Sequence, residues 1–302
     1  MNVFVTGASG LVGRRLCAAL RGRGDDVVAL TRSARPPTPG LRWVMVDPLA
    51  PTDWTGELAG CSAVVNLAGE TIGQRWTPKR RASIFASRVR STQALVEAIA
   101  RLDTRPTVLI SASAIGFYGT DPQQTFQETS PQGRGFLADL CFEWEKAALG
   151  AEALGVRVVR PRFGLVLSAE GGALPKLLSP LKLGVGAKLG SGEQWVSWIL
   201  IDDLVALLLW ALDTPAVRGA VNAVAPQPVR HRELMDTLGH VVGRRAWLRA
   251  PAPMIRLALG AMADEMLLSG QQVSSARAQA QGFVFRFPTL EMALRSIAEL
   301  LP

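Results

Sequence analysis

A glycine-rich turn close to the first residue limits what this chain can fold into. The apolar, β-rich run 2–6 leads directly into glycines spaced as GxxGxxG. A helical pattern follows, with Leu16, Ala19 and Leu20 on one face, and the next apolar run is 27–31. A strand, a tight turn, a helix and a second strand within about 30 residues predict two parallel strands joined by a right-handed crossover.

The alternation of apolar runs and helical patterns continues. Further strands are expected at 43–46, 63–67, 107–111 and 156–160, and helices at about 78–101 and 135–154. Strands that alternate with helices predict an α/β fold with a Rossmann-type, doubly wound parallel sheet.

The rhythm changes after residue 160. Residues 164–197 are rich in Gly and Pro, 198–203 are expected to return to the sheet, and the chain from about 226 is mostly helical with proline breaks. We therefore predict a nucleotide-binding domain from 1–163 plus about 198–225. A smaller, mostly helical C-terminal substrate region comprises 164–197 plus 226–302.

The three glycines have separate roles in a dinucleotide-binding turn. Gly7 allows the tight turn, Gly10 lets the backbone approach a pyrophosphate, and Gly13 lets the helix pack closely on the strand. The helix N-terminus offers free N–H groups and partial positive charge to phosphates. The predicted contacts here are Thr6, Gly7, Ser9, Gly10, Leu11, Val12 and Gly13.

The end of the second strand indicates which dinucleotide binds. NAD-specific sites place a carboxylate there, but this chain has Thr31 and Arg32 and no acidic residue from Leu30 to Leu41. An arginine offers a planar cationic fork to a 2′-phosphate. The predicted cofactor is NADP(H), with Thr31 and Arg32 as contacts; the alternative is an exposed surface arginine.

Two later strand ends supply further cofactor contacts. Asp47 follows the third strand and is expected to meet the adenine region. Small residues after the fourth strand permit close approach, so Leu67, Ala68 and Gly69 are predicted to line the middle of the cofactor. Glu70 and Arg75 are expected to bracket its nicotinamide end.

Composition excludes several other classes of protein. The net charge of +8 is scattered, without a block of five like charges, which favours solvated helix faces over a nucleic-acid surface. Three cysteines without CxxC spacing fit a reducing compartment, and two histidines offer neither a metal site nor a Ser-His-Asp triad. No signal peptide or membrane span is apparent, so we predict a cytoplasmic protein with no membrane or nucleic-acid partner and no metal.

Four segments resemble the extended short-chain dehydrogenase/reductase superfamily, of the nucleotide-sugar epimerase type: TGASGLVG, NLAG, SASAIGFYG and RPRFGLVL. NLAGETI, SRVRST, the CxxWE of 141–145, GSGEQWVSWI and the helical tail are similar to one branch. That branch is the NAD-dependent epimerase/dehydratase-like "epimerase family protein" group, which includes cell-division-inhibitor-like homologues and carries a C-terminal domain of unknown function. The likeness covers essentially the whole chain.

The resemblance implies a catalytic serine but conflicts with the usual tyrosine. Ser113 matches the serine that orients the substrate. The superfamily also uses a Tyr in YxxxK as its acid/base, yet the one tyrosine here, Tyr118, lies before the relevant helix. One register puts Cys141 and Glu145 at the Tyr and Lys positions, and the next puts Phe142 and Lys146 there.

Neither register restores the Tyr–Lys pair, so the proton source stays open. A glutamate at the lysine position raises the pKa of a neighbouring acid. The remaining candidates are Cys141, Glu70, Tyr118 and water, although Cys141 also fits a buried helix cysteine. The predicted catalytic residues are Ser113 and Cys141.

Other expectations also follow from the resemblance. It implies cofactor contacts at Arg88, Ser111, Arg160 and Pro161. Relatives often dimerise through the two long helices, 78–101 and 135–154 here, so a homodimer is compatible with the sequence.

The substrate is the least determined part. The predicted cleft-facing or core tryptophans are Trp76, Trp144, Trp195 and Trp198. A small, partly apolar substrate suits aromatic walls, and no arginine cluster supports a second nucleotide diphosphate. Two hypotheses remain: an NADP(H)-dependent oxidoreductase or epimerase-like enzyme, and a catalytically degenerate sensor that acts through protein partners.

Overall fold

A parallel sheet forms the centre of the computed structural model, which describes residues 1–49 and 54–298. Its strands lie in the order β13 (Gly219–Ala223), β8 (Arg157–Phe163), β5 (Val108–Ser111), β4 (Ala63–Asn66), β1 (Asn2–Thr6), β2 (Asp26–Thr31) and β3 (Leu41–Met45), and β6 (Ser113–Ala114) pairs with β8. In chain order this is the doubly wound Rossmann arrangement, extended by one strand. The predicted fold class is confirmed.

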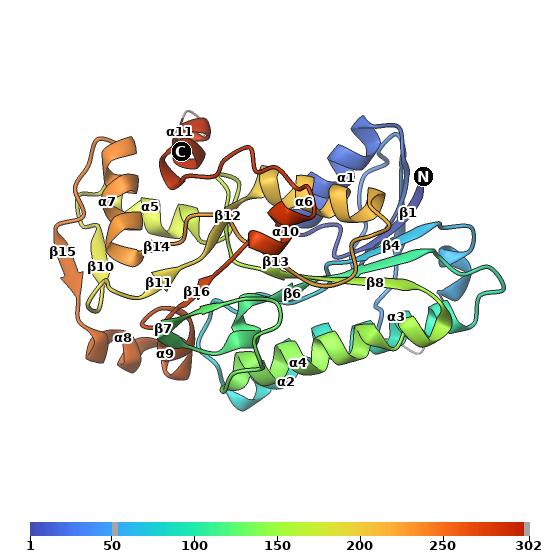
Figure 1. Ribbon diagram of the computed structural model, residues 1–302, viewed down its shortest axis with the longest axis horizontal. Coiled ribbons are helices and arrows are strands. Elements are labelled where there is room, and N and C mark those ends of the chain that lie inside the picture. The colour runs from blue at the N-terminus through green and yellow to red at the C-terminus, as the bar shows by residue number, and fades with distance from the viewer. Residues whose placement is uncertain (50–53, 299–302) are drawn as a thin grey trace.

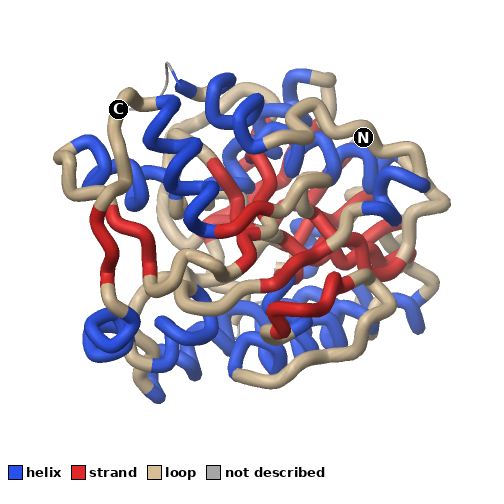
Figure 2. Tube along the Cα trace, turned by 60° about the vertical axis from the view of Figure 1, so that its left-hand side comes forward, coloured by secondary structure: helices blue, strands red, loops and turns tan. Residues whose placement is uncertain are grey.

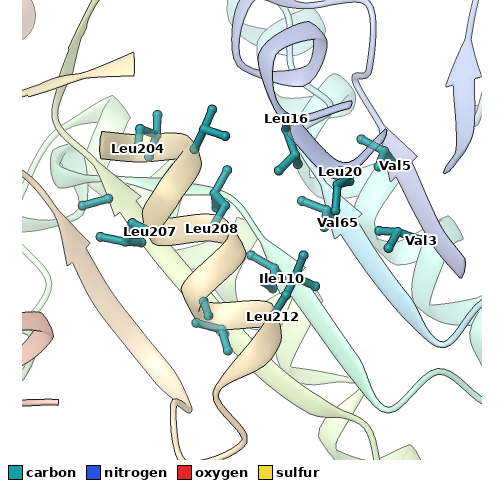
Figure 3. Packing of buried hydrophobic residues seen from close by; sticks show 14 of the residues in the cluster. Val3, Val5, Leu16, Leu20, Val65, Ile110, Leu204, Leu207, Leu208 and Leu212 are labelled. Atoms are coloured by element: carbon teal, nitrogen blue, oxygen red, sulfur yellow. The ribbon is translucent and has the colours of Figure 1, made fainter. Parts of the chain in front are cut away.

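Helices cover both faces of this sheet (Figure 1). One face carries α1 (Leu11–Gly22), α6 (Ile201–Asp213) and the short α10 (Ala276–Ala280); the other carries α2 (Pro78–Phe85), α3 (Ser91–Ala100) and α4 (Phe136–Leu149). Because side chains alternate along a strand, Val3 and Val5 pack beneath α1 and α6 while Phe4 packs against α3. Figure 3 shows Leu16 of α1 and Leu208 of α6 in the first of these cores.

The long helix predicted over 78–101 is interrupted. Between α2 and α3 the chain makes a π-helical turn at Ala86–Arg90. Such turns insert an extra residue into a helix and are frequent at functional sites. The helix expected over 135–154 is α4 followed by a 3-10 turn at Glu152–Leu154.

The remaining elements form a second group beyond one end of the sheet (Figure 2). Its strands pair two by two, as β9 (Leu165–Leu167) with β12 (Trp198–Leu200), β10 (Ala187–Leu189) with β15 (Leu248–Ala250), β11 (Trp195–Val196) with β14 (Val229–Arg230), and β7 (Asp121–Phe126) with β16 (Gln271–Val273). Its helices are α5 (Leu174–Lys182), α7 (His231–Val241), α8 (Ala252–Leu259), α9 (Ala261–Met266) and α11 (Leu290–Ser296). Residues 299–302 of the predicted C-terminal region lie outside the described residues.

The expected return of 198–203 to the central sheet is wrong. β12 pairs with β9, α6 begins at Ile201, and β13 is the strand that extends the central sheet beside β8. Trp198 explains the difference, because its side chain is fully buried in the core of the second group and its indole N–H donates to the Gln227 carbonyl. Among the described residues, no helix is both long and apolar enough to cross a membrane.

Candidate active site

The glycine turn at the carboxyl end of β1 has the geometry of a phosphate cradle. Gly7 has φ +66°, and a Cβ there would lie 2.4 Å from the Leu67 carbonyl oxygen. A Cβ on Gly13 would lie 2.3 Å from the Gly7 carbonyl oxygen. A Cβ on Gly10 would meet the Gly7 oxygen alone, at 3.2 Å. Gly7 and Gly13 are thus required by packing, whereas Gly10 leaves room beside the turn.

The N-terminus of α1 adds electrostatic attraction for an anion. Its N-cap, Gly10, supplies no side-chain hydrogen bond, and its first turn holds no acidic residue. The N–H groups of this turn therefore keep their donor capacity and the positive end of the helix dipole. The predicted contacts Ser9, Leu11 and Val12 belong to this turn, and Thr6 precedes it with its hydroxyl donating to Asn66.

Arg32 lies at the same edge of the sheet, directly after β2. Its side chain is 68% exposed, and its Nη1 is 3.8 Å from Oε1 of Glu70. Thr31, in contrast, is buried, and its hydroxyl donates to the Ser33 carbonyl. Of the two, Arg32 is the side chain free to reach an incoming phosphate.

Glu70 is held by a cation that sequence reasoning missed. Nη1 of Arg80 lies 3.0 Å from Oε2 of Glu70, and the Ser83 hydroxyl donates to the same oxygen at 2.9 Å. Nε of Arg75, the expected partner at the nicotinamide end, lies instead near Gly260. The pattern PKRRAS gave a signal, since three basic residues follow a helix start, but the sequence does not say which one turns inward.

The other strand ends place the predicted residues as follows. The Asp47 carboxylate accepts from the Leu49 N–H in a local turn after β3. Leu67 forms the wall against which Gly7 packs, and Gly69 faces the Arg88 guanidinium. Ser111 ends β5.

A buried hydrogen-bonded network fixes the ends of β1, β4 and β5. Asn66 is its centre: its Oδ1 accepts from Thr6, and its Nδ2 donates to Thr92 at 2.8 Å and to Ser111 at 3.1 Å. The Trp144 indole also donates to Thr92. Asn66 and Thr92 are not among the predicted site residues, although both lie within the quoted motifs.

Arg88 lies on the π-helical turn and faces the end of β4. Its Nη2 donates to the Glu70 carbonyl at 2.9 Å, and its guanidinium is 5.3 Å from the Trp144 ring centroid. Burial lowers the pKa of this guanidinium. The structure thus brings Arg88 to the glycine-lined backbone at Gly69, and contact with a cofactor remains a prediction.

Ser113 belongs to a buried ionic cluster. Its hydroxyl donates to Oε1 of Glu145 at 2.7 Å. Two arginines of β8 hold the same carboxylate, with Arg160 on Oε2 at 2.7 Å and Arg162 on Oε1 at 2.7 Å. The Arg162 guanidinium also lies over the Phe117 ring at 3.6 Å. Arg160 thus donates to Glu145, and its neighbour Pro161 lies within β8.

The two alignments of the CxxWE segment correspond to two different faces of α4. Cys141 and Glu145 are buried, whereas Phe142 and Lys146 are exposed. The inward-facing register therefore carries a thiol and a carboxylate. Burial, followed by the negative charge of Glu145, raises the pKa of Cys141 to about 12, in the direction expected for a glutamate at this place.

Tyr118, the other proton source considered, is buried in its own cluster. Its hydroxyl donates to Oδ1 of Asn222 at 2.6 Å, and its ring stacks on Phe126. Burial raises the pKa of Tyr118 to about 12. This tyrosine therefore connects β13 to the loop after β6.

The tryptophans contribute mainly to cores. Trp76 and Trp144 share one buried cluster and Trp198 lies in another, while Trp195 is half-buried beneath the Arg230 guanidinium. Trp76, Trp144 and Trp198 are therefore core residues, which was one of the two predicted roles for the tryptophans.

Comparison with known proteins accounts for this arrangement. The model of the NAD dependent epimerase/dehydratase family matches residues 3–223, and a domain of unknown function, DUF1731, matches residues 250–297. The chain belongs to the NAD dependent epimerase/dehydratase family.

Relatives within this family align over nearly the whole chain. The chloroplastic epimerase family protein SDR39U1 homolog of Arabidopsis thaliana is 41% identical over 99% of this chain and 87% of its own length. The epimerase family protein SSP1921 of Staphylococcus saprophyticus is 38% identical over 98% of this chain and 99% of its own. The crystal structure of human epimerase family protein SDR39U1 (isoform2) with NADPH superposes with a TM-score of 0.87 at 34% identity, covering 99% of both chains. The expected epimerase-family branch with its C-terminal domain of unknown function is confirmed.

Proposed function

We propose that this epimerase-family chain binds NADP(H) and acts as an oxidoreductase or epimerase-like enzyme on a small, still unidentified substrate without the usual Tyr–Lys pair. One observation carries the cofactor assignment: Arg32 is exposed at the end of β2, beside the glycine turn, and no acidic residue follows this strand from Leu30 to Leu41. The human relative crystallised with NADPH supports the same choice.

The chain's own residues fit that cofactor. Gly10 leaves space beside the turn, and the α1 N-terminus attracts the pyrophosphate. Arg32 binds the 2′-phosphate, and Arg88 lies by the backbone of Gly69 toward the nicotinamide side. When bound, NADP(H) supplies or accepts a hydride.

The domain assignment is part of the same proposal. Residues 1–163 plus about 198–225 hold the cofactor, and 164–197 plus 226–302 form the substrate region, in a cytoplasmic protein. The pairing of β7 with β16 supports cooperation between the cofactor domain and the substrate region, because it joins the segment after β6 to the C-terminal segment.

Titration calorimetry with NADPH and with NADH, repeated on Arg32→Ala, tests the cofactor. We expect NADPH to bind at least tenfold more tightly than NADH, and the preference to collapse in the variant because a charge-assisted contact to phosphate is lost. Arg35→Ala, three residues away in the loop after β2, is the matched control and should keep the preference. Equal binding of both dinucleotides by the wild type would refute the assignment.

The state of Ser113 favours a second candidate function, a cofactor-dependent sensor without turnover. Its hydroxyl is buried and donates to Glu145, and Cys141 is buried with a raised pKa. Turnover on a panel of alcohols with NADP⁺ and of carbonyl compounds with NADPH separates the two functions. Activity that Ser113→Ala abolishes supports the enzyme; tight NADPH binding with no turnover, plus a protein partner in pull-downs, supports the sensor.

A further inference from the structure

The Arg32–Glu70 approach crosses the cofactor edge of the sheet. In the sheet β1 lies between β2 and β4, so a residue after β2 and one after β4 can meet only across the end of β1. The end of β1 is the glycine turn that starts at Gly7. Glu70 therefore extends over the same edge that holds the phosphate cradle.

Arg80 reaches this place from a different element. It lies on the first turn of α2, and its guanidinium is fixed by Glu70 through Nη1 at 3.0 Å and by the Thr71 carbonyl through Nη2 at 2.7 Å. Its Nε is buried and has no hydrogen-bond partner. The guanidinium thus shares the Glu70 carboxylate with Arg32, and its Nε donor is not satisfied within the protein.

The three groups form an arrangement that suits a phosphate dianion. Two guanidinium groups approach the two oxygens of one carboxylate, which occupies the position of an anion between them. The contact with Arg32 is loose, at 3.8 Å, and Arg32 is 68% exposed, so this side opens at little cost. A phosphate that enters there gains two cations and meets repulsion from Glu70.

We infer that Arg80 is the second cation of the 2′-phosphate site and that Glu70 is the counter-ion which orients both arginines before NADP(H) binds and weakens that binding. This inference rests on the proposed NADP(H) function. It assigns specificity to α2, an element that begins 47 residues after the end of β2.

Calorimetric dissociation constants for NADPH and NADH on Arg80→Ala test the inference. We expect NADPH binding to weaken about tenfold and NADH binding by less than twofold, because the loss is specific to the 2′-phosphate. Lys79→Ala removes a positive charge from the neighbouring exposed position on the same helix and should change both constants by less than twofold.

Glu70→Gln should change NADPH affinity in the opposite direction, and this test does not require that the Arg80→Ala variant folds. It keeps an oxygen for Ser83 and removes the negative charge, so NADPH should bind several-fold more tightly with NADH little changed. Arg80→Lys, which keeps the charge but loses the fork, should fall between wild type and Arg80→Ala. Circular dichroism and melting temperatures verify that each variant is folded.

Two results overturn the inference. In the first, Arg80→Ala weakens NADPH and NADH equally or leaves both unchanged; in the second, Glu70→Gln fails to strengthen NADPH binding. Measurements on the wild type and on Arg32→Ala test the proposed NADP(H) function separately from the role of Arg80. If the wild type prefers NADPH and Arg32→Ala loses the preference while Arg80→Ala keeps it, the cofactor assignment stands and the role of Arg80 is refuted.

Discussion

The Ser113 hydroxyl donates a 2.7 Å hydrogen bond to Oε1 of Glu145, so the serine proton points into the protein. An ionised carboxylate only accepts hydrogen bonds, and this one also accepts from Arg160 and Arg162. Ser113 therefore presents only lone pairs to any further partner. A substrate that contacts Ser113 in this state must offer an O–H or N–H group.

Removing the Glu145 carboxylate should greatly lower the free energy of unfolding of the protein. Glu145→Ala leaves Arg162, whose side chain is 4% exposed, without its counter-ion. Breaking a buried pair from one side costs about 3–5 kcal/mol. Urea denaturation measures this loss, and Glu143→Ala on the same helix is the control, expected within about 0.5 kcal/mol of wild type. A loss below about 1 kcal/mol for Glu145→Ala would contradict the structural role of the cluster.

The Cys141 thiol should be inert in the folded protein. Burial, followed by the charge of Glu145, raises its pKa to about 12, so the thiol stays protonated at pH 8. Since the thiolate is the nucleophile, iodoacetamide at pH 8 should leave Cys141 unmodified in native protein and alkylate it in urea. Peptide mass spectrometry reads out the site. Rapid native labelling of Cys141 would show that the helix face is open.

The nucleotide-binding edge was predictable because its determinants are local. Gly7, Gly10 and Gly13 act within one turn, and Arg32 follows one strand, so spacing alone predicts their positions. The parallel sheet was predictable for the same reason, since the spacing of apolar residues within each segment indicates whether it forms a strand or a helix.

The ionic partners were not predictable, because they depend on contacts between distant elements. Glu145 meets Arg162 across 17 residues, and Arg80 meets Glu70 across 10, through the packing of helices on strand ends. One of the two alignments placed Glu145 at the usual lysine position, but the sequence did not indicate that two arginines compensate its charge. Trp198 likewise lies in an apolar run typical of a strand in the central sheet. Its burial in the core of the second group depends on tertiary packing that the local sequence does not indicate.

His231 should make the protein sensitive to mild acid. Burial, followed by the positive charge of Lys188, lowers the pKa of His231 to about 4, and neither ring nitrogen has a hydrogen-bond partner among the described residues. The folded state keeps the ring neutral, whereas the unfolded chain takes up a proton below pH 6.5. Unfolding therefore binds a proton between pH 6.5 and 4, and stability falls as pH falls through that window, by up to about 3 kcal/mol.

His231→Leu tests this linkage. The variant should lose less stability than wild type between pH 6.5 and 4 in urea titrations, because the buried group no longer titrates. His240→Leu, at an exposed position on the same helix, should follow the wild-type curve. Parallel curves for wild type and His231→Leu would exclude His231 as the source of acid sensitivity.

Glu265 ties the C-terminal segment to the helix that carries Cys141 and Glu145. Its Oε1 accepts from the Phe136 N–H at 3.1 Å and its Oε2 from the Leu137 N–H at 2.9 Å, where Gly135 offers no side-chain cap to α4. The carboxylate thus satisfies two unpaired donors and opposes the positive end of the helix dipole.

Glu265→Ala should therefore destabilise the protein by about 1–2 kcal/mol, in the range of a lost N-cap. Glu265→Gln keeps one acceptor and should lose less. Asp264→Ala, which breaks only an exposed pair with Arg256, is the matched control and should cost at most about 0.5 kcal/mol. Hydrogen exchange at the Phe136 and Leu137 amides should accelerate in Glu265→Ala and not in Asp264→Ala. If both variants exchange alike, the first turn of α4 does not depend on the C-terminal segment.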